Sequence, residues 1–237
     1  MRIFKWVFRV LLIVTLFMLG GLVVVLVLTN KADSEALEIL DQPHVSIEDR
    51  IIILDHGDAT HNLIFYQGGL VETEAYLVFL NQLSEQGIRV FVPRMPLNLA
   101  ILGRSFVDII LEQYPSDLPW VVMGHSLGGA ALSFVVDERF DSYILLASYP
   151  AESVDLSDKN IRVLSITASL DGVLNVENHI LAKERLPLDT VYVDIEGGNH
   201  AQFGHYGKQR NDNDATISRE TQQDLTIQAI LSFLNLD

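Results

Sequence analysis

Ser126 has the sequence surroundings that most clearly indicate chemistry. It lies within Gly-His-Ser-Leu-Gly at 124–128, directly after an apolar run at 120–123. This is the spacing of a nucleophile elbow, a sharp turn between a strand and a helix that exposes a serine hydroxyl. Glycines two residues either side suit such a turn, because side chains there would collide with the strand or the helix. The pattern predicts that Ser126 is a nucleophile; the alternative is a bystander serine in a glycine-rich turn.

A serine nucleophile needs a base within hydrogen-bond reach, and an acid must orient that base. In chains with an elbow of this kind, the acid comes after the serine in the sequence and the histidine comes last. Asp171 follows the apolar segment 162–167, and His200 follows the segment 190–195 and two glycines. Both are expected at the edge where parallel strands end and ligands bind. We therefore predict that Asp171 and His200 complete a triad with the serine, with His205 as the alternative base.

Acyl chemistry at a serine also needs two backbone N–H groups that stabilise the charge of the tetrahedral intermediate. The residue after the serine, Leu127, is expected to provide one of them. Segment 62–66 is followed by Gln67, Gly68 and Gly69, where glycines let a backbone amide approach a ligand closely. The second donor is therefore predicted to be Gly68 or Gly69, with Gln67 as the alternative.

The length of one connection predicts the shape of the site. Residues 148–161, between two expected strands, are too few to form a cap of several helices. We therefore expect a shallow, open site that prefers short acyl chains. Its walls are predicted to come from Met95, Leu97 and Tyr149. His125, beside the nucleophile, is interpreted as a packing residue or part of the wall.

These residues must be positioned by a sheet and its helices. Segments rich in Val, Ile and Leu alternate with segments of helical period. Near-continuous apolar strands are typical of a sheet covered by helices on both faces. The alternation predicts an α/β fold with a doubly wound, mostly parallel sheet. The expected strands are 50–54, 62–66, 89–92, 120–123, 143–147, 162–167 and 190–195, and the expected helices are 71–86, 98–113, 128–139, 175–185 and 217–235.

An uncharged, almost wholly apolar run at 10–28 follows the basic residues Arg2, Lys5 and Arg9. As a helix it would span roughly 28 Å, close to the hydrocarbon core of a bilayer. A cleavable signal peptide has a shorter apolar core, so we expect an uncleaved anchor. Basic residues before the run should stay in the cytoplasm, which predicts a single-pass cell-membrane protein with an extracytoplasmic domain. The predicted parts are a basic cytoplasmic tail at 1–9, a transmembrane signal anchor at 10–28, a linker at 29–49 and an α/β domain at 50–237.

Charge and composition exclude several partners and cofactors. The chain has a net charge of −15, and residues 1–31 carry four positive charges and no acidic residue, so the remainder stands at −19. Such a domain is repelled by nucleic acid, which we therefore exclude as a partner. The chain has no cysteine, hence no disulfide and no thiolate nucleophile. We expect no cofactor and no metal. The acidic tract 211–214 lacks the glycine and terminal glutamate of an EF-hand loop and is interpreted as a solvated turn.

Together these motifs resemble the α/β-hydrolase superfamily over about residues 50–237. The segments 93–100 and 197–204 are similar to those of a compact, lid-less bacterial group near the dienelactone-hydrolase-like (alpha/beta hydrolase fold-5) branch, whose members often carry an N-terminal membrane segment. The resemblance implies that Ser126 is the nucleophile, Asp171 the acid and His200 the base. The chain departs from the superfamily at 66–69, where many members have a His-Gly pair, which weakens the assignment of the second oxyanion donor.

The expected activity is that of a serine hydrolase acting on an ester or related acyl bond of a small molecule. The same machinery can transfer an acyl group to another acceptor or cleave a peptide, and the sequence does not separate these reactions. The alternative from another class is a catalytically silent member of the fold that serves as a cell-surface binding module.

Overall fold

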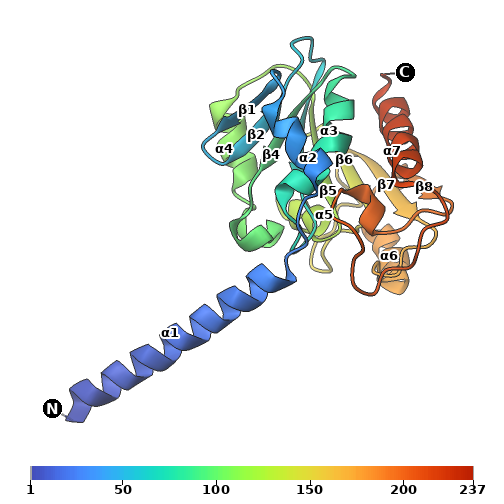
Figure 1. Cartoon of the computed structure of the whole chain (residues 1–237). Coiled ribbons are helices and arrows are strands. Elements are labelled where there is room, and N and C mark those ends of the chain that lie inside the picture. Colours follow the sequence, from blue (N-terminus) through green and yellow to red (C-terminus); the bar gives the residue numbers. More distant parts are fainter. Residues whose placement is uncertain (1, 237) are drawn as a thin grey trace.

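The computed structural model describes residues 2–236, without the side chains of residues 2–5, 8, 16–17, 19, 22–24 and 26. Its centre is an eight-stranded sheet in the order β1-β2-β4-β3-β5-β6-β7-β8 (Figure 1). The β1–β2 and β2–β4 pairs are antiparallel, and every other pair is parallel. The predicted doubly wound, mostly parallel sheet is confirmed. The strands are β1 (Val45–Glu48), β2 (Ile51–Leu54), β3 (His61–Tyr66), β4 (Ile88–Pro93), β5 (Trp120–His125), β6 (Ser142–Leu146), β7 (Arg162–Ala168) and β8 (Val191–Ile195).

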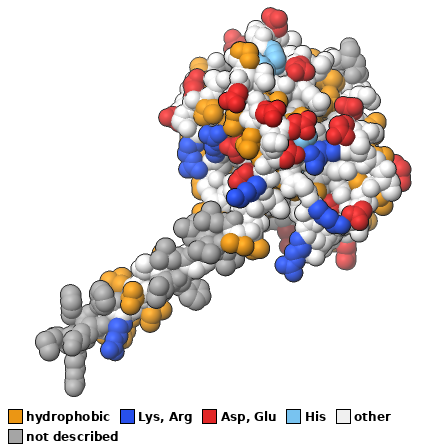
Figure 2. Space-filling view, viewed as in Figure 1, with side chains coloured by type: hydrophobic (Ala, Val, Ile, Leu, Met, Phe, Trp, Pro, Cys, Tyr) orange, Lys and Arg blue, Asp and Glu red, His pale blue; other side chains and the backbone are white. Residues whose placement is uncertain are grey.

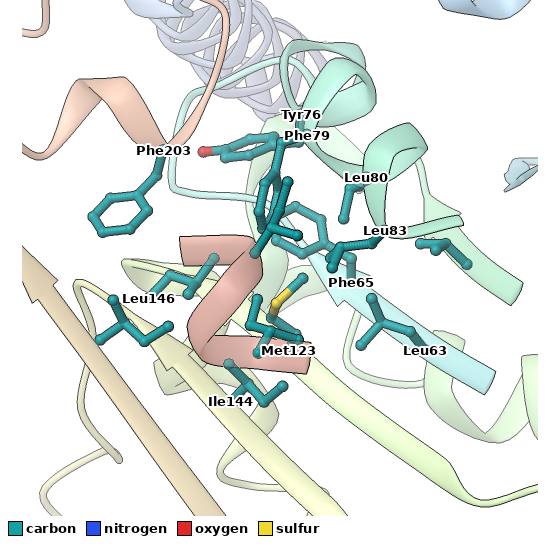
Figure 3. Close-up of a cluster of buried hydrophobic side chains, with 14 of the residues drawn as sticks. Leu63, Phe65, Tyr76, Phe79, Leu80, Leu83, Met123, Ile144, Leu146 and Phe203 are labelled. Carbon is teal, nitrogen blue, oxygen red and sulfur yellow. The ribbon is translucent and has the colours of Figure 1, made fainter. Parts of the chain in front are cut away.

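The central strands are mostly apolar because each faces two hydrophobic layers. Leu63 and Phe65 of β3 belong to the layer that also contains residues of α3 (Leu77–Ser84) and α7 (Arg219–Leu234), part of which Figure 3 shows. Their neighbour Ile64 belongs to the layer with residues of α4 (Phe106–Gln113) and α5 (Leu127–Leu132). Successive residues of a strand point to opposite faces of the sheet. A helix layer on each side therefore buries both sets of side chains.

The helices lie close to their predicted positions, although several are shorter. The expected helix 98–113 is helical only from Phe106, because Leu97 and Asn98 both have a φ of 54°. A positive φ breaks the right-handed helix, and short 3₁₀ turns occupy 96–98 and 100–102 instead. Apart from α1 (Arg2–Leu28), α3 and α7, the helices are α2 (Ser34–Glu38), α4 (Phe106–Gln113), α5 (Leu127–Leu132) and α6 (Val176–Ala182).

The segment 29–49, predicted to be a linker, is instead packed onto the domain. It contains α2 and β1, and β1 extends the sheet by pairing with β2. Asn30 forms a parallel bridge with Val71, and its N–H donates to the carbonyl of Leu70 at 2.8 Å. The polar composition of this segment suggested a linker, but its backbone groups form hydrogen bonds with the domain. The domain therefore begins before residue 50.

The first helix, α1 (Arg2–Leu28), extends away from the domain (Figure 1). Among the residues that the structure describes, none of the helices is both long and apolar enough to cross a bilayer. The predicted span at 10–28 falls in part on side chains outside the described residues.

The surface of the domain carries the acidic excess seen in the sequence. On the face that Figure 2 shows, Asp and Glu side chains are spread over much of the domain, with fewer Lys and Arg side chains between them. Several basic groups are already paired with acids, for example Arg89 with Asp55 at 2.6 Å and Arg94 with Glu74 at 2.6 Å.

Candidate active site

The turn between β5 and α5 has the geometry of a nucleophile elbow. Ser126 stands at its tip with φ 51° and ψ −121°, a strained conformation for a residue with a side chain. A Cβ at Gly124 would lie 2.4 Å from the backbone nitrogen of Gly129, and one at Gly128 would lie 2.1 Å from the carbonyl oxygen of Tyr66. Strand and helix approach so closely that only glycine fits at either position.

Hydrogen bonds to β6 and to the loop after it hold the elbow in this strained conformation. The N–H of Ser126 donates to the carbonyl of Leu146 at 2.9 Å. The Ser148 hydroxyl donates to the carbonyl of Ser126 at 2.6 Å. A Cβ at Gly129 would lie 2.4 Å from that hydroxyl oxygen, so this glycine makes room for the bond. The surrounding structure thus fixes the position of the Ser126 backbone.

Asp171 and His200 come from loops after β7 and β8 and meet through their side chains. Asp171 Oδ2 and His200 Nδ1 are 2.7 Å apart, and both side chains are almost completely buried. The other carboxylate oxygen of Asp171 accepts the N–H groups of Val173 and Leu174, each at 2.8 Å. These bonds leave the Asp171 carboxylate satisfied and aimed at the imidazole. A histidine that donates from Nδ1 keeps Nε2 as an acceptor.

Ser126 and His200 line the same cavity, whose volume is about 280 Å³. His200 Nε2 is buried and has no hydrogen-bond partner among the described residues. Buried polar atoms normally have partners, so an orphan atom at a cavity marks a place where a ligand or a reacting group can bind. The structure thus brings all three predicted triad residues to one site.

The two glycines proposed as oxyanion donors differ in the structure. The N–H of Gly68 is buried and donates to the Tyr76 hydroxyl at 3.1 Å, so it is already used. The N–H of Gly69 has no hydrogen-bond partner in the described part of the chain. Gly69 also lies against Leu127, since a Cβ built on it would lie 3.0 Å from the Leu127 side chain. This favours Gly69 over Gly68 as the partner of Leu127.

His125 is a packing residue with a defined hydrogen bond. Its Nδ1 lies 2.8 Å from the Tyr76 hydroxyl, and its ring centroid lies 4.5 Å from that of His200. Burial, with His200 nearby, lowers the pKa of His125 well below its usual value. Burial also raises the pKa of the Tyr76 phenol. A neutral His125 therefore accepts a hydrogen bond from a protonated Tyr76.

His205, the alternative base, does not line this cavity. It is buried, and its Nδ1 accepts a hydrogen bond from Arg219 at 3.0 Å. The carboxylates of Asp33 and Glu35 lie within 3.5 Å of the same ring atom. These three groups are close enough to hold a cation, but Arg219 already donates to Asp33 at 3.0 Å and supplies the positive charge. His205 joins α7 to the N-terminal segment.

Only one of the three predicted wall residues lines the cavity. Tyr149 does, whereas Met95 and Leu97 do not. Met95 is buried in the layer beneath α4, where its sulfur fills the space that a Cβ of Gly103 would need. Leu97 is exposed on the surface turn created by its own positive φ. Sequence reasoning missed the actual wall, which includes Ala130, Ala147, Ser148, Val173, Leu174 and Asn175.

A mostly parallel sheet with an antiparallel start, and a serine elbow facing an acid–histidine pair, are the defining features of α/β hydrolases. The model of the Alpha/beta hydrolase family matches residues 62–224, and the chain belongs to this family. The predicted superfamily resemblance is thereby confirmed. The narrower resemblance to a lid-less bacterial branch stays a prediction. No curated protein sequence matches the chain at a significant level.

Solved structures with the same fold include esterases and a thioesterase. The acyl-protein thioesterase 2 of Zea mays has 12% identity and a TM-score of 0.57, with 79% of this chain and all of that chain covered. Esterase 2 of Thermogutta terrifontis, phosphorylated by paraoxon, has 13% identity and a TM-score of 0.57 over 80% of this chain and 94% of its own. A predicted CIB-like hydrolase from Thermoplasma acidophilum has 14% identity and a TM-score of 0.60 over 81% and 98%. At these identities the likeness shows the fold alone.

Proposed function

We propose that this chain is a serine hydrolase that cleaves an ester or thioester through Ser126, His200 and Asp171. One observation carries the proposal: a strained serine and a buried histidine line one cavity, and the histidine is hydrogen-bonded to a carboxylate at 2.7 Å. The unpartnered His200 Nε2 is the atom that the reaction would use as a base. Family membership supports the same chemistry.

The proposed reaction has two halves. In the first, Ser126 Oγ attacks the acyl carbon while its proton passes to His200 Nε2, and the N–H groups of Leu127 and Gly69 accommodate the oxyanion. The bond to the leaving group then breaks, and His200 returns the proton to the departing oxygen or sulfur. In the second half, water gives a proton to His200 Nε2 and attacks the acyl carbon. The bond from that carbon to Ser126 Oγ then breaks, and His200 returns the proton to Oγ, which releases the acid and restores both residues. Asp171 holds the imidazole throughout.

The cavity supports a short acyl group as substrate. Its volume of about 280 Å³ lies near the lower end of typical ligand pockets. No helix occurs in the fully described loop 147–161, so no helical cap is inserted there. Ala130, Ala147 and Val173 give it a small apolar wall. An acyl chain of a few carbons fits such a site, and a long chain would leave most of its length in water.

We also propose that residues 10–28 anchor the protein in the cell membrane with the domain outside the cytoplasm. The uncharged run and the preceding basic residues support this. Described side chains of α1, such as Leu11, Ile13 and Met18, are 59%, 63% and 71% exposed. An exposed apolar patch of this kind favours a lipid environment. Alkaline extraction of membranes tests the anchor: the chain should stay in the pellet, and recovery in the supernatant would refute it.

A fluorophosphonate probe tests the hydrolase proposal directly, because such probes phosphylate only an activated serine. We expect the full-length protein to be labelled at Ser126, as mapped by peptide mass spectrometry. The matched control is Ser133→Ala, since Ser133 is a buried serine only seven positions further along the chain. Ser126→Ala should abolish labelling, and Ser133→Ala should leave it intact.

Two variants separate the hydrolase from a silent binding module of the same fold. Asp171→Asn and His200→Ala should each lower ester turnover by about three orders of magnitude while the domain stays folded. A folded wild-type protein that takes no label and hydrolyses no ester would leave only the binding module. Product analysis in the presence of an alcohol acceptor would reveal acyl transfer.

A further inference from the structure

The tract 211–214, predicted to be a solvated turn, buries one of its acids. Asp212 is 9% exposed, whereas the neighbouring Asp214 side chain is 84% exposed and pairs only with Lys208 among the described residues. Asn211 takes a left-handed conformation with φ 68°, which asparagine tolerates, and this turns the following residue inward. The two acids of one short tract therefore lie in opposite environments.

The Asp212 carboxylate accepts four backbone N–H groups. Oδ1 receives those of Gly172 at 3.0 Å, His200 at 3.3 Å and Asn213 at 3.0 Å. Oδ2 receives that of Ala201 at 2.9 Å. Gly172 directly follows Asp171 in the loop after β7, and His200 and Ala201 belong to the loop after β8. One carboxylate thus joins the backbones of both loops beside the Asp171–His200 hydrogen bond.

The tract that carries this carboxylate packs tightly against the loop after β7. A Cβ at Gly172 would lie 2.5 Å from the carbonyl oxygen of Asn211 and 2.9 Å from the nitrogen of Asn213. On the other side, Asn199 donates from its side chain to the carbonyl of Asn213 at 2.7 Å. The backbone N–H and carbonyl of Asn199 are both bound by the Gln222 amide. The backbone at His200 is therefore held from two directions.

We propose that Asp212 is a positioning residue that sets the distance between the Asp171 and His200 side chains, an inference that rests on the proposed function. Gly172 and His200 lie outside the strands and helices, and Ala201 begins a short 3₁₀ turn, so the sheet alone does not fix the relative position of the two loops. A carboxylate is suited to this task because it can accept several N–H groups at once, and charged acceptors form the stronger bonds. Asparagine at this position would turn one acceptor into a donor facing a backbone N–H.

Asp212→Asn in the full-length protein tests the proposal, and Asp214→Asn is its matched control. Hydrolysis of a short-chain ester gives kcat and KM. The downfield proton resonance of the His200 imidazole reports its hydrogen bond to Asp171. The resonance is assigned by its absence in His200→Gln. We expect Asp212→Asn to lower kcat between about 10- and 100-fold, to leave KM within about twofold, and to shift or remove the resonance. Asp214→Asn should change neither kcat nor the resonance.

The resonance separates positioning from general stability. A folded Asp212→Asn protein whose resonance is unmoved would overturn the proposal, whatever its rate. If that variant does not fold, Asp212→Glu keeps the charge but moves the oxygens by one methylene, and the same reading applies to it. If the wild type hydrolyses no ester, the proposed function fails, whereas the resonance still decides the role of Asp212.

Discussion

Tyr76→Phe removes one oxygen atom that two buried groups share. The hydroxyl accepts the N–H of Gly68 at 3.1 Å and lies 2.8 Å from His125 Nδ1, to which it donates. Tyr76 and His125 are both 0% exposed, and the Tyr76 hydroxyl points toward the segment of Phe203 (Figure 3). A phenylalanine ring keeps the packing but leaves one donor and one acceptor without partners. The substitution therefore isolates the polar contribution of the hydroxyl.

The expected loss follows from these two groups. A buried polar group left without its partner costs about 1–3 kcal/mol, so the free energy of unfolding should fall by about 2–6 kcal/mol. This is a large part of the roughly 5–15 kcal/mol that holds a domain together. In a chain of this size it corresponds to a melting temperature lower by about 4–24 °C. Because Gly68 precedes the proposed oxyanion donor Gly69, kcat should also fall by about tenfold or more.

Urea denaturation at pH 7.5 and ester kinetics measure the two effects. The control is Tyr114→Phe, which removes a hydroxyl that donates to Glu48 at the surface at 2.6 Å. Water can replace that bond, so the control should lose less than about 1 kcal/mol. A Tyr76→Phe protein as stable as the control would refute the reasoning, because it would show that Gly68 and His125 find other partners at no cost.

Three further predictions concern acid, the elbow and the substrate. Burial lowers the pKa of His125 well below 6.5, so the unfolded chain binds more protons than the folded one as the pH falls. The contribution of His125 to the free energy of unfolding is therefore complete above pH 6.5 and should fall below it by up to about 1.4 kcal/mol per pH unit. Urea denaturation between pH 7.5 and 5.5 measures this loss. Gly128→Ala places a Cβ 2.1 Å from the Tyr66 carbonyl and should abolish fluorophosphonate labelling; a labelled, folded variant would contradict the elbow geometry. Across an acyl series of p-nitrophenyl esters, kcat/KM should be at least about tenfold higher for butyrate than for palmitate, and the reverse order would mean that the site extends beyond the cavity.

The sheet and the elbow could be predicted because local rules determine them. A strand such as β5 is buried at every position and apolar from Trp120 to Met123 because it is covered on both faces, and this apolar run is visible without a structure. The glycines at 124 and 128 are required by steric contacts that recur wherever a strand turns sharply into a helix. The order of serine, acid and histidine then follows from the topology, since each residue comes after a strand that ends at the same edge.

The cavity walls and the supporting hydrogen bonds could not be predicted because contacts distant in sequence determine them. Met95 is placed in the core by the space beside Gly103, and no local pattern reveals this. The capture of the Gly68 N–H by Tyr76 depends on how the turn after β3 folds back. Asp212 lies in a tract of polar residues, where composition indicates solvent exposure, yet four backbone N–H groups bury it. The composition of a segment predicts its average exposure, whereas the burial of one residue such as Asp212 depends on the groups that surround it.

The N-terminal segment connects α1 to the loop that we propose for oxyanion binding. Asn30, two residues after α1 ends, pairs with Val71, and its carbonyl accepts the N–H of Glu72 at 2.9 Å. Only one residue separates Val71 from Gly69, so backbone pairing links the end of α1 to the Gly69 loop. A flexible tether would leave the orientation of the domain free, whereas this pairing fixes the oxyanion loop relative to residue 30. If α1 is an anchor, as we propose, the oxyanion loop is joined to it through a paired backbone and not through a free tether.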